Sequence, residues 1–146
     1  MRFFPVYWGQ QGGIFMKKLM AIFLVALLLA GCAGGNTDLV EIDVGQSKLY
    51  SEAEIEAAMD VVLRNFERGW EGCVMLSLWY DEEATAEEAT ERAEDYGAEQ
   101  VIILYSNYWV DGSGRNPTQN PNSLYKNWNW ILARNGGKWE LKDCGY

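Results

Sequence analysis

The sequence predicts an α+β domain in which helices pack on one face of a curved, mainly antiparallel sheet that ends in a three-strand meander. Three observations lead to this fold class. Apolar and acidic residues alternate over 40–44, which is the period of a half-buried strand. Segments with helical spacing then precede and follow a second apolar strand. Three further strand-like segments come last with no helix between them, and this order is typical of α+β domains.

The first strand and the first helix are predicted from local patterns. Val40, Ile42 and Val44 alternate with acidic residues, and Gly45 ends the strand. Ser51 and Glu54 stand at the spacing of a capping box, so we expect a helix to begin there. Its apolar face recurs at helical spacing until Gly69 and Gly72, at Ile55, Met59, Val62 and Phe66.

A second strand and a second helix follow. Strict alternation over residues 73–80 would place Val74, Leu76, Leu78 and Tyr80 on one face, and Cys73, Met75, Ser77 and Trp79 on the other. Thr85 and Glu88 have the spacing of another capping box. We therefore expect a short acidic helix from Thr85 to Tyr96, with Gly97 as its stop.

The C-terminal third reads as a meander. Residues 100–110 are almost continuously apolar and rich in β-branched and aromatic side chains, which favours a central strand. Residues 111–122 have the composition of an exposed loop. Strands at 124–134 and 138–142 are joined by Asn135, Gly136 and Gly137, which suit a tight turn.

Composition limits the function of the chain. Nine basic residues stand against 21 acidic ones after Cys32, a formal net charge of −12, and this charge repels phosphate groups. We therefore expect no nucleic-acid partner. The chain has no histidine, which removes the commonest general base and metal ligand. We expect no catalytic residues, no metal site and no cofactor.

The N-terminal region has the pattern of a targeting signal. Lys17 and Lys18 precede the apolar run 19–30, which is too short for a membrane-spanning helix of about 20 residues. Leu29, Ala30, Gly31 and Cys32 follow, and this tetrapeptide resembles the lipobox of bacterial lipoproteins. The resemblance implies cleavage after Gly31, a diacylglyceryl group and further acylation on Cys32, and a membrane-anchored protein on the extracytoplasmic face. The alternative is an ordinary secretory signal that happens to end before a cysteine.

These boundaries divide the chain into four parts. Residues 1–15 are an aromatic-rich extension upstream of a complete signal, and we expect translation to start at Met16. Residues 16–31 are the signal peptide, residues 32–38 are a flexible tether rich in glycine, and residues 39–146 are a single domain. The final hairpin, from Trp130 to Tyr146, resembles small lipoproteins with a nuclear-transport-factor-like or cystatin-like cone fold.

Cys73 and Cys144 are available to pair once Cys32 carries lipid. A disulfide closing so long a loop would stabilise the domain by roughly 4 kcal/mol in the chain-entropy model. Two free thiols are the equally weighted alternative, because the spacing of the two residues in the fold is unknown from sequence.

Aromatic and amide residues interleave on two neighbouring strands of the meander. The candidate binding surface consists of Tyr105, Trp109, Trp128 and Trp130. The alternative is that these rings fill the core. A period of two would place Trp128 and Trp130 on one face, and Tyr125, Asn127 and Asn129 on the other.

Together these features predict a non-enzymatic, membrane-tethered domain that binds a protein or glycan of the cell envelope. The rival interpretation is a small hydrolase or isomerase that uses carboxylates and tyrosines in a cone-shaped cavity. A deep pocket holding a carboxylate with perturbed acidity would favour the enzyme. A filled core with exposed tryptophans would favour the binding domain.

Overall fold

The computed structural model describes residues 34–146, so the predicted signal sequence, its cleavage site after Gly31 and the predicted lipidation site Cys32 lie outside the described part. Within it, the chain forms an α+β fold with two helices and five strands, as predicted. No helix among these residues is both long and apolar enough to cross a membrane. The elements are β1 (Glu41–Asp43), α2 (Glu52–Gly69), β2 (Cys73–Tyr80), α3 (Glu82–Tyr96), β3 (Gln100–Val110), β4 (Ser123–Arg134) and β5 (Glu140–Gly145).

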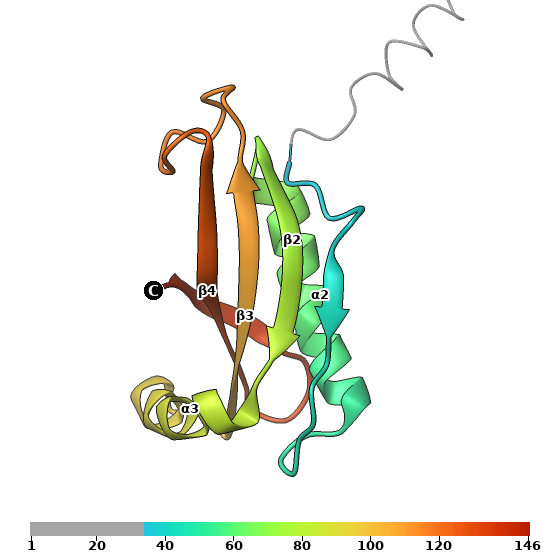
Figure 1. The fold of residues 1–146 in the computed structure, drawn as a ribbon. Coiled ribbons are helices and arrows are strands. Elements are labelled where there is room, and N and C mark those ends of the chain that lie inside the picture. The colour runs from blue at the N-terminus through green and yellow to red at the C-terminus, as the bar shows by residue number, and fades with distance from the viewer. Residues whose placement is uncertain (1–33) are drawn as a thin grey trace, which may run out of the picture. The chain divides into compact units, whose positions relative to one another are not determined.

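The five strands form one sheet in the order β1-β2-β3-β4-β5 (Figure 1). β1 runs parallel to β2, and the other three neighbouring pairs are antiparallel. β3, β4 and β5 therefore make the predicted C-terminal meander. β3 is the central strand, and the loop 111–122 connects its end to β4 (Figure 1).

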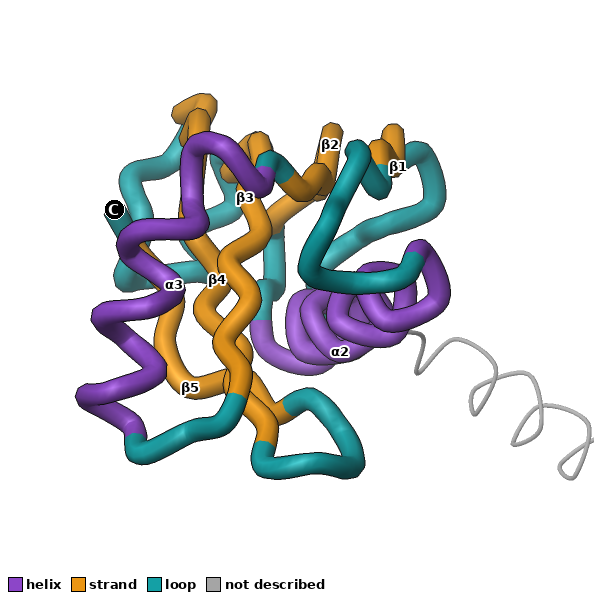
Figure 2. Tube along the Cα trace, turned by 90° about the horizontal axis from the view of Figure 1, so that it is seen from below, coloured by secondary structure: helices purple, strands orange, loops and turns teal. Residues whose placement is uncertain are grey.

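The two helices lie on opposite faces of the sheet, not on one face as the sequence had indicated (Figure 2). The reason is the unbroken apolar run at the start of β3. Ile102 and Leu104 belong to the core under α2, whereas Val101 and Ile103 belong to a second cluster under α3. A strand that is apolar on both faces has to be covered on both faces.

Helix α2 confirms the predicted capping box. The Ser51 hydroxyl accepts from the Glu54 amide, and the Glu54 carboxylate accepts from the Ser51 amide at 2.8 Å. The helix ends where Trp70 donates its amide to the Phe66 carbonyl. Its buried face comprises Ile55, Ala58, Met59, Val62 and Phe66.

Helix α3 begins one turn earlier than the sequence indicated. Asp81 is the N-cap and accepts from the Ala84 amide at 3.1 Å. Thr85 lies inside the helix, where its buried hydroxyl donates to the Asp81 carbonyl at 2.7 Å. Asp81 is the cap because aspartate is preferred over threonine at the N-cap position. Gly97 ends the helix in the left-handed region, as predicted.

Two β-bulges lie on either side of Asn107 and change which residues share a face. The β2–β3 register shifts between Met75 and Ser77, so Leu76 is the extra residue. The β3–β4 register also shifts here, next to Asn127, which has a φ of 55°. The strict alternation predicted for β2 and for β4 is therefore wrong beyond each bulge. One extra residue moves every later side chain of the strand to the opposite face of the sheet.

The predicted tether is docked on the domain from Gly34 onward. The Gly35 amide donates to the Phe66 carbonyl at 3.0 Å, and Asn36 pairs with Val74 at the edge of β2. A Cβ on Gly34 would lie 1.6 Å from the Glu67 carbonyl oxygen, and one on Gly35 would lie 2.3 Å from the Phe66 ring. The two glycines therefore permit a close approach of the chain to α2, and this contradicts a flexible linker over residues 34–38.

Candidate binding face

The four aromatic residues predicted to form one surface lie on two faces of the sheet. Tyr105 and Trp109 point away from α2, and Trp109 is 39% exposed. Trp130 is fully buried on the α2 side and Trp128 is half-buried against the same core. The prediction of a single surface is therefore wrong. Trp128 and Trp130 belong to the core, and Tyr105 and Trp109 lie on the opposite face of the sheet.

The inner cluster explains why Trp130 is not available to a ligand. Its indole N–H donates to the buried Ser106 hydroxyl at 2.8 Å. Its ring packs against Phe66 and Trp70, with centroids 6.3 and 5.2 Å away. Such aromatic pairs stabilise the core beyond the area that they bury.

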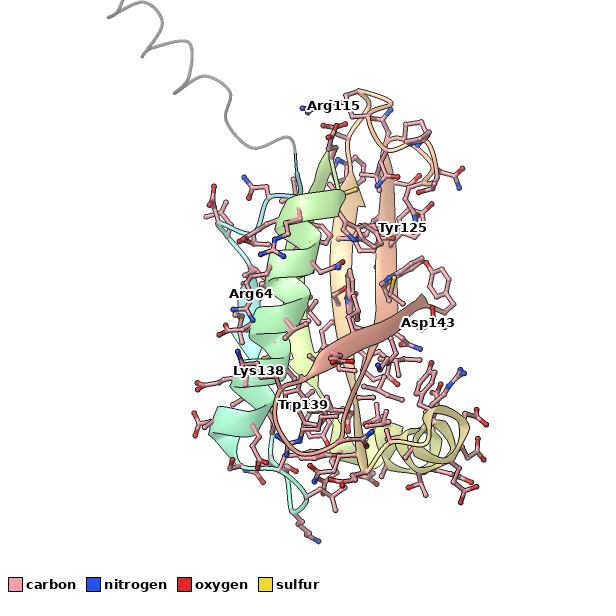
Figure 3. The ribbon with its side chains drawn as sticks, turned by 180° about the vertical axis from the view of Figure 1, so that it is seen from behind. Arg64, Arg115, Tyr125, Lys138, Trp139 and Asp143 are labelled. Atoms are coloured by element: carbon pink, nitrogen blue, oxygen red, sulfur yellow. The ribbon has the colours of Figure 1, made fainter. Side chains whose placement is uncertain are left out.

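Tyr125 also belongs to this inner side, against the prediction that it would face away from Trp128. It stacks on Tyr108 with ring centroids 5.0 Å apart and meets Trp128 edge-on at 5.9 Å. Figure 3 shows Tyr125 on the α2 side of the sheet. The bulge at Asn127 causes the change, because it inserts one residue between Tyr125 and Trp128.

The opposite side of the sheet carries the candidate site, which we call the outer face. It comprises the residues of β2, β3 and β4 that face away from α2 and are not in the α3 cluster. Its centre is a pair of rings, Trp79 and Tyr105, with centroids 5.7 Å apart and planes inclined by 30°. Cross-strand pairing places Ser77 beside Asn107, and Asn129 beside Tyr105. The outer face thus combines aromatic rings with amides and a hydroxyl.

The two asparagine side chains of the outer face differ in their hydrogen bonding. Asn107 Oδ1 accepts from the Asn127 amide at 3.0 Å, which fixes the side-chain orientation of Asn107. Asn129 Oδ1 is buried and has no hydrogen-bond donor among the described residues. An unpaired buried acceptor costs free energy, so such a group is commonly satisfied by water or a ligand.

Tyr105 keeps its proton on this face. Burial raises the pKa of its phenol, and the nearby carboxylates of Glu88 and Asp81 raise it further. The hydroxyl is therefore a neutral donor and acceptor at physiological pH.

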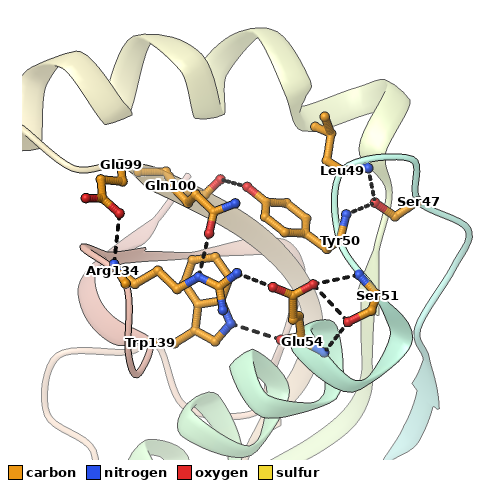
Figure 4. Close-up of polar contacts among 11 residues, drawn as sticks. Ser47, Leu49, Tyr50, Ser51, Glu54, Glu99, Gln100, Arg134 and Trp139 are labelled. Atoms are coloured by element: carbon orange, nitrogen blue, oxygen red, sulfur yellow. Dashed lines mark hydrogen bonds and ion pairs between the residues drawn. The ribbon is translucent and has the colours of Figure 1, made fainter.

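A group of polar contacts centred on Arg134, the Arg134 hub, was not predicted from the sequence (Figure 4). The guanidinium pairs with the Glu54 carboxylate, donates to Gln100 Oε1 at 2.7 Å, and lies 4.2 Å from the ring centre of Trp139. The Trp139 indole N–H donates to the Glu54 carbonyl at 2.9 Å. The contacts of Glu54 with Arg134 and Trp139 tie α2 to the β4–β5 hairpin, and they join residues 80 and 85 positions apart, beyond the reach of local sequence patterns.

Local hydrogen bonds lower the pKa of four described carboxyl groups, those of Glu54, Glu82, Asp111 and Glu140. Glu54 hydrogen-bonds to Arg134 and Ser51, and these contacts lower its pKa to about 2. Hydrogen bonds from Ser47 and Lys48 lower the pKa of Glu82, and those from Ser113 lower that of Asp111. Residues 34–146 contain no group of side chains arranged to hold a metal ion. These carboxylates act as hydrogen-bond acceptors that fix loops and helix ends.

The interior holds rings where a cone-shaped fold would have a cavity. Tyr108, Phe66 and Trp130 are each fully buried between α2 and the sheet. A separate groove of about 360 Å³ lies between α2 and the β4–β5 turn, where Asp60 and Arg64 face Lys138 and Trp139. This groove is open to solvent and borders the Arg134 hub.

Cys73 and Cys144 are free thiols in the structure, the first buried and the second half-buried. Burial raises the pKa of both thiols. The Asn116 amide lies 3.4 Å from the Cys73 sulfur and holds the loop 111–122 against the start of β2. The disulfide that the sequence left open is not formed here.

Comparison with known proteins adds no family to this description. No family model, no curated protein and no solved structure matches the chain.

Proposed function

We propose that this chain is a lipid-anchored extracytoplasmic protein whose outer face binds a neutral glycan of the cell envelope. The observation that carries the proposal is the half-buried Trp79–Tyr105 pair, which belongs to neither core cluster and is bordered by Asn107 and Asn129. Aromatic rings pack on the C–H surfaces of sugars, and amides exchange hydrogen bonds with hydroxyl groups. The acidic surroundings disfavour an anionic ligand.

The rival enzymatic function has less support. A carboxyl group that acts as a general acid needs a pKa near the operating pH, which means a raised pKa. The pKa values of Glu54, Glu82, Asp111 and Glu140 are instead lowered by local hydrogen bonds. The interior under α2 is filled by side chains of Phe66, Tyr108 and Trp130. Both features suit a binding domain with a packed core.

The anchor is supported by the signal pattern that ends at Cys32. Several acyl chains on one cysteine hold a protein stably on a membrane, whereas a single chain holds it only marginally. A Cys32→Ser variant should therefore leave the membrane fraction, whereas a Cys144→Ser variant should remain there. Equal membrane retention of both variants would contradict lipid anchoring.

Binding to the outer face is tested with isolated envelope polysaccharide in a sedimentation assay. Trp79→Ala and Tyr105→Ala should each weaken binding by at least about tenfold, which corresponds to about 1.4 kcal/mol. Tyr146→Ala is the matched control, because this ring is 80% exposed and contacts Tyr125 and Trp128 on the inner side.

Two results would contradict the glycan proposal. One is unchanged sedimentation of both outer-face variants. The other is binding to crude envelopes that disappears after protease treatment, which would assign the outer face to a protein ligand instead.

A further inference from the structure

The docked segment at the start of the domain restricts how far the domain can stand from an anchor on Cys32. Both backbone polar groups of Asn36 are hydrogen-bonded to β2. Its amide donates to the Cys73 carbonyl at 2.9 Å, and its carbonyl accepts from the Met75 amide at 2.9 Å. Gly35 is held by Phe66 and Gly34 lies against the Glu67 carbonyl. The chain is therefore part of the domain from Gly34 on.

Only two residue steps separate Cys32 from Gly34. Even when fully extended, two residues span only about 7 Å. A lipid on Cys32 would consequently hold the domain at the membrane surface by the end that contains Gly34. This step rests on the lipid anchor of the proposed function.

The end of the sheet next to Gly34 exposes apolar side chains. Val74, which pairs with Asn36, lies beside Trp109 on β3, and Trp109 lies beside Leu124 on β4. Leu76, the extra residue of the β2 bulge, stands two positions along from Val74. Leu76, Trp109 and Leu124 are 41%, 39% and 44% exposed. We call these three residues the apolar rim.

Charge is distributed unequally between the two ends of the domain. Eight carboxylates stand against one arginine in residues 81–96, the segment of α3. This helix covers Val101 and Ile103, at the end of β3 far from the apolar rim (Figure 1). At the Gly34 end, Arg68, Arg115 and Lys126 stand against Asp38, Glu67, Glu71 and Asp111, so this end is close to neutral. An anionic lipid surface would repel the α3 end and tolerate the rim end.

We infer that the apolar rim is a membrane-contacting surface, with Trp109 at the level of the lipid headgroups and α3 pointing away from the bilayer. Tryptophan is enriched at this level of membranes because its ring is apolar and its N–H is polar. Four residue steps of β3 lead from Trp109 to Tyr105, a distance of about 13 Å along the strand. The Trp79–Tyr105 pair therefore stands clear of the headgroups and faces the envelope.

The test uses the full-length protein, extracted with its lipid and reconstituted into vesicles of phosphatidylethanolamine and phosphatidylglycerol with brominated acyl chains. Bromine quenches tryptophan fluorescence at short range. Trp109→Phe should abolish most of the bromine-dependent quenching, whereas Trp79→Phe should leave it intact. A flexible linker of glycine and serine inserted between Ala33 and Gly34 should reduce the quenching of the otherwise unchanged protein.

The outcomes separate this inference from the function on which it rests. Partitioning of the extracted protein into detergent, with and without Cys32→Ser, reports the anchor alone. If the protein is anchored and Trp109→Phe leaves quenching unchanged, the membrane contact is wrong and the anchor stands. If the unsubstituted protein fails to partition into detergent, the anchor is wrong and the membrane contact falls with it.

Discussion

The hydrogen bond between Trp130 and Ser106 tests whether the aromatic residues of β4 lie on the α2 side of the sheet. Both side chains are fully buried, and the indole N–H donates to the hydroxyl at 2.8 Å. Ser106→Ala leaves a buried N–H without an acceptor, which costs about 1–3 kcal/mol. Trp130→Phe leaves the hydroxyl without its donor and also leaves part of the indole volume empty, so its cost should be larger.

The double variant isolates the contact. Once Trp130 is phenylalanine, replacing Ser106 by alanine removes a hydroxyl that has already lost its partner, so the second change should cost much less than it does alone. We expect a coupling energy of about 1–2 kcal/mol from the double-mutant cycle. Urea unfolding of residues 33–146, followed by far-UV circular dichroism, measures it without relying on tryptophan emission.

Strictly additive effects would refute this assignment. A coupling energy within about 0.3 kcal/mol of zero is what independent sites give. It would mean that Trp130 does not reach Ser106 in the core, and the facing of β4 beyond its bulge would then be wrong.

Three further predictions concern the Arg134 hub, the docked segment and the thiols. Glu54→Gln should lower the free energy of unfolding at neutral pH. The loss relative to the unsubstituted protein should shrink as the pH falls from about 4.5, the ordinary pKa of a glutamate, to about 2, the pKa of Glu54 in the fold. A loss that stays constant in unfolding curves at acid pH would exclude the Arg134 pair as its cause. Gly35→Ala should cost about 1–3 kcal/mol in urea unfolding, because the buried Phe66 cannot move aside, whereas Gly69→Ala, with open space around it, should cost nothing; equal effects would argue against docking. Cys73 and Cys144 should react with a thiol reagent in denaturant without reductant and react slowly before unfolding, and a zero count in denaturant would reveal a disulfide.

The elements with strong local signals were predictable from sequence. The capping box at Ser51 fixes the start of α2, and Gly97 fixes the end of α3. The bounds of β3 agree with the prediction because its apolar run is long and ends in a loop rich in glycine and asparagine. These features depend on residues that are close together in the chain.

Features that depend on contacts between distant segments were not predictable in the same way. The bulges at Leu76 and Asn127 leave no distinctive composition, although each reverses the facing of a strand. Gly34 and Gly35 resemble a flexible linker, because the Phe66 and Glu67 atoms that require them lie more than 30 positions away. The candidate site was therefore half right, with Tyr105 and Trp109 outside and Trp128 and Trp130 inside.

The lipid anchor can be measured by intact-mass spectrometry of the protein purified from the membrane fraction. We expect a chain that begins at Cys32 and carries the mass of a diacylglyceryl group, with or without a further acyl chain on its amine. A chain that begins elsewhere, or one with an unmodified Cys32, would show that the protein is not lipid-anchored at this residue.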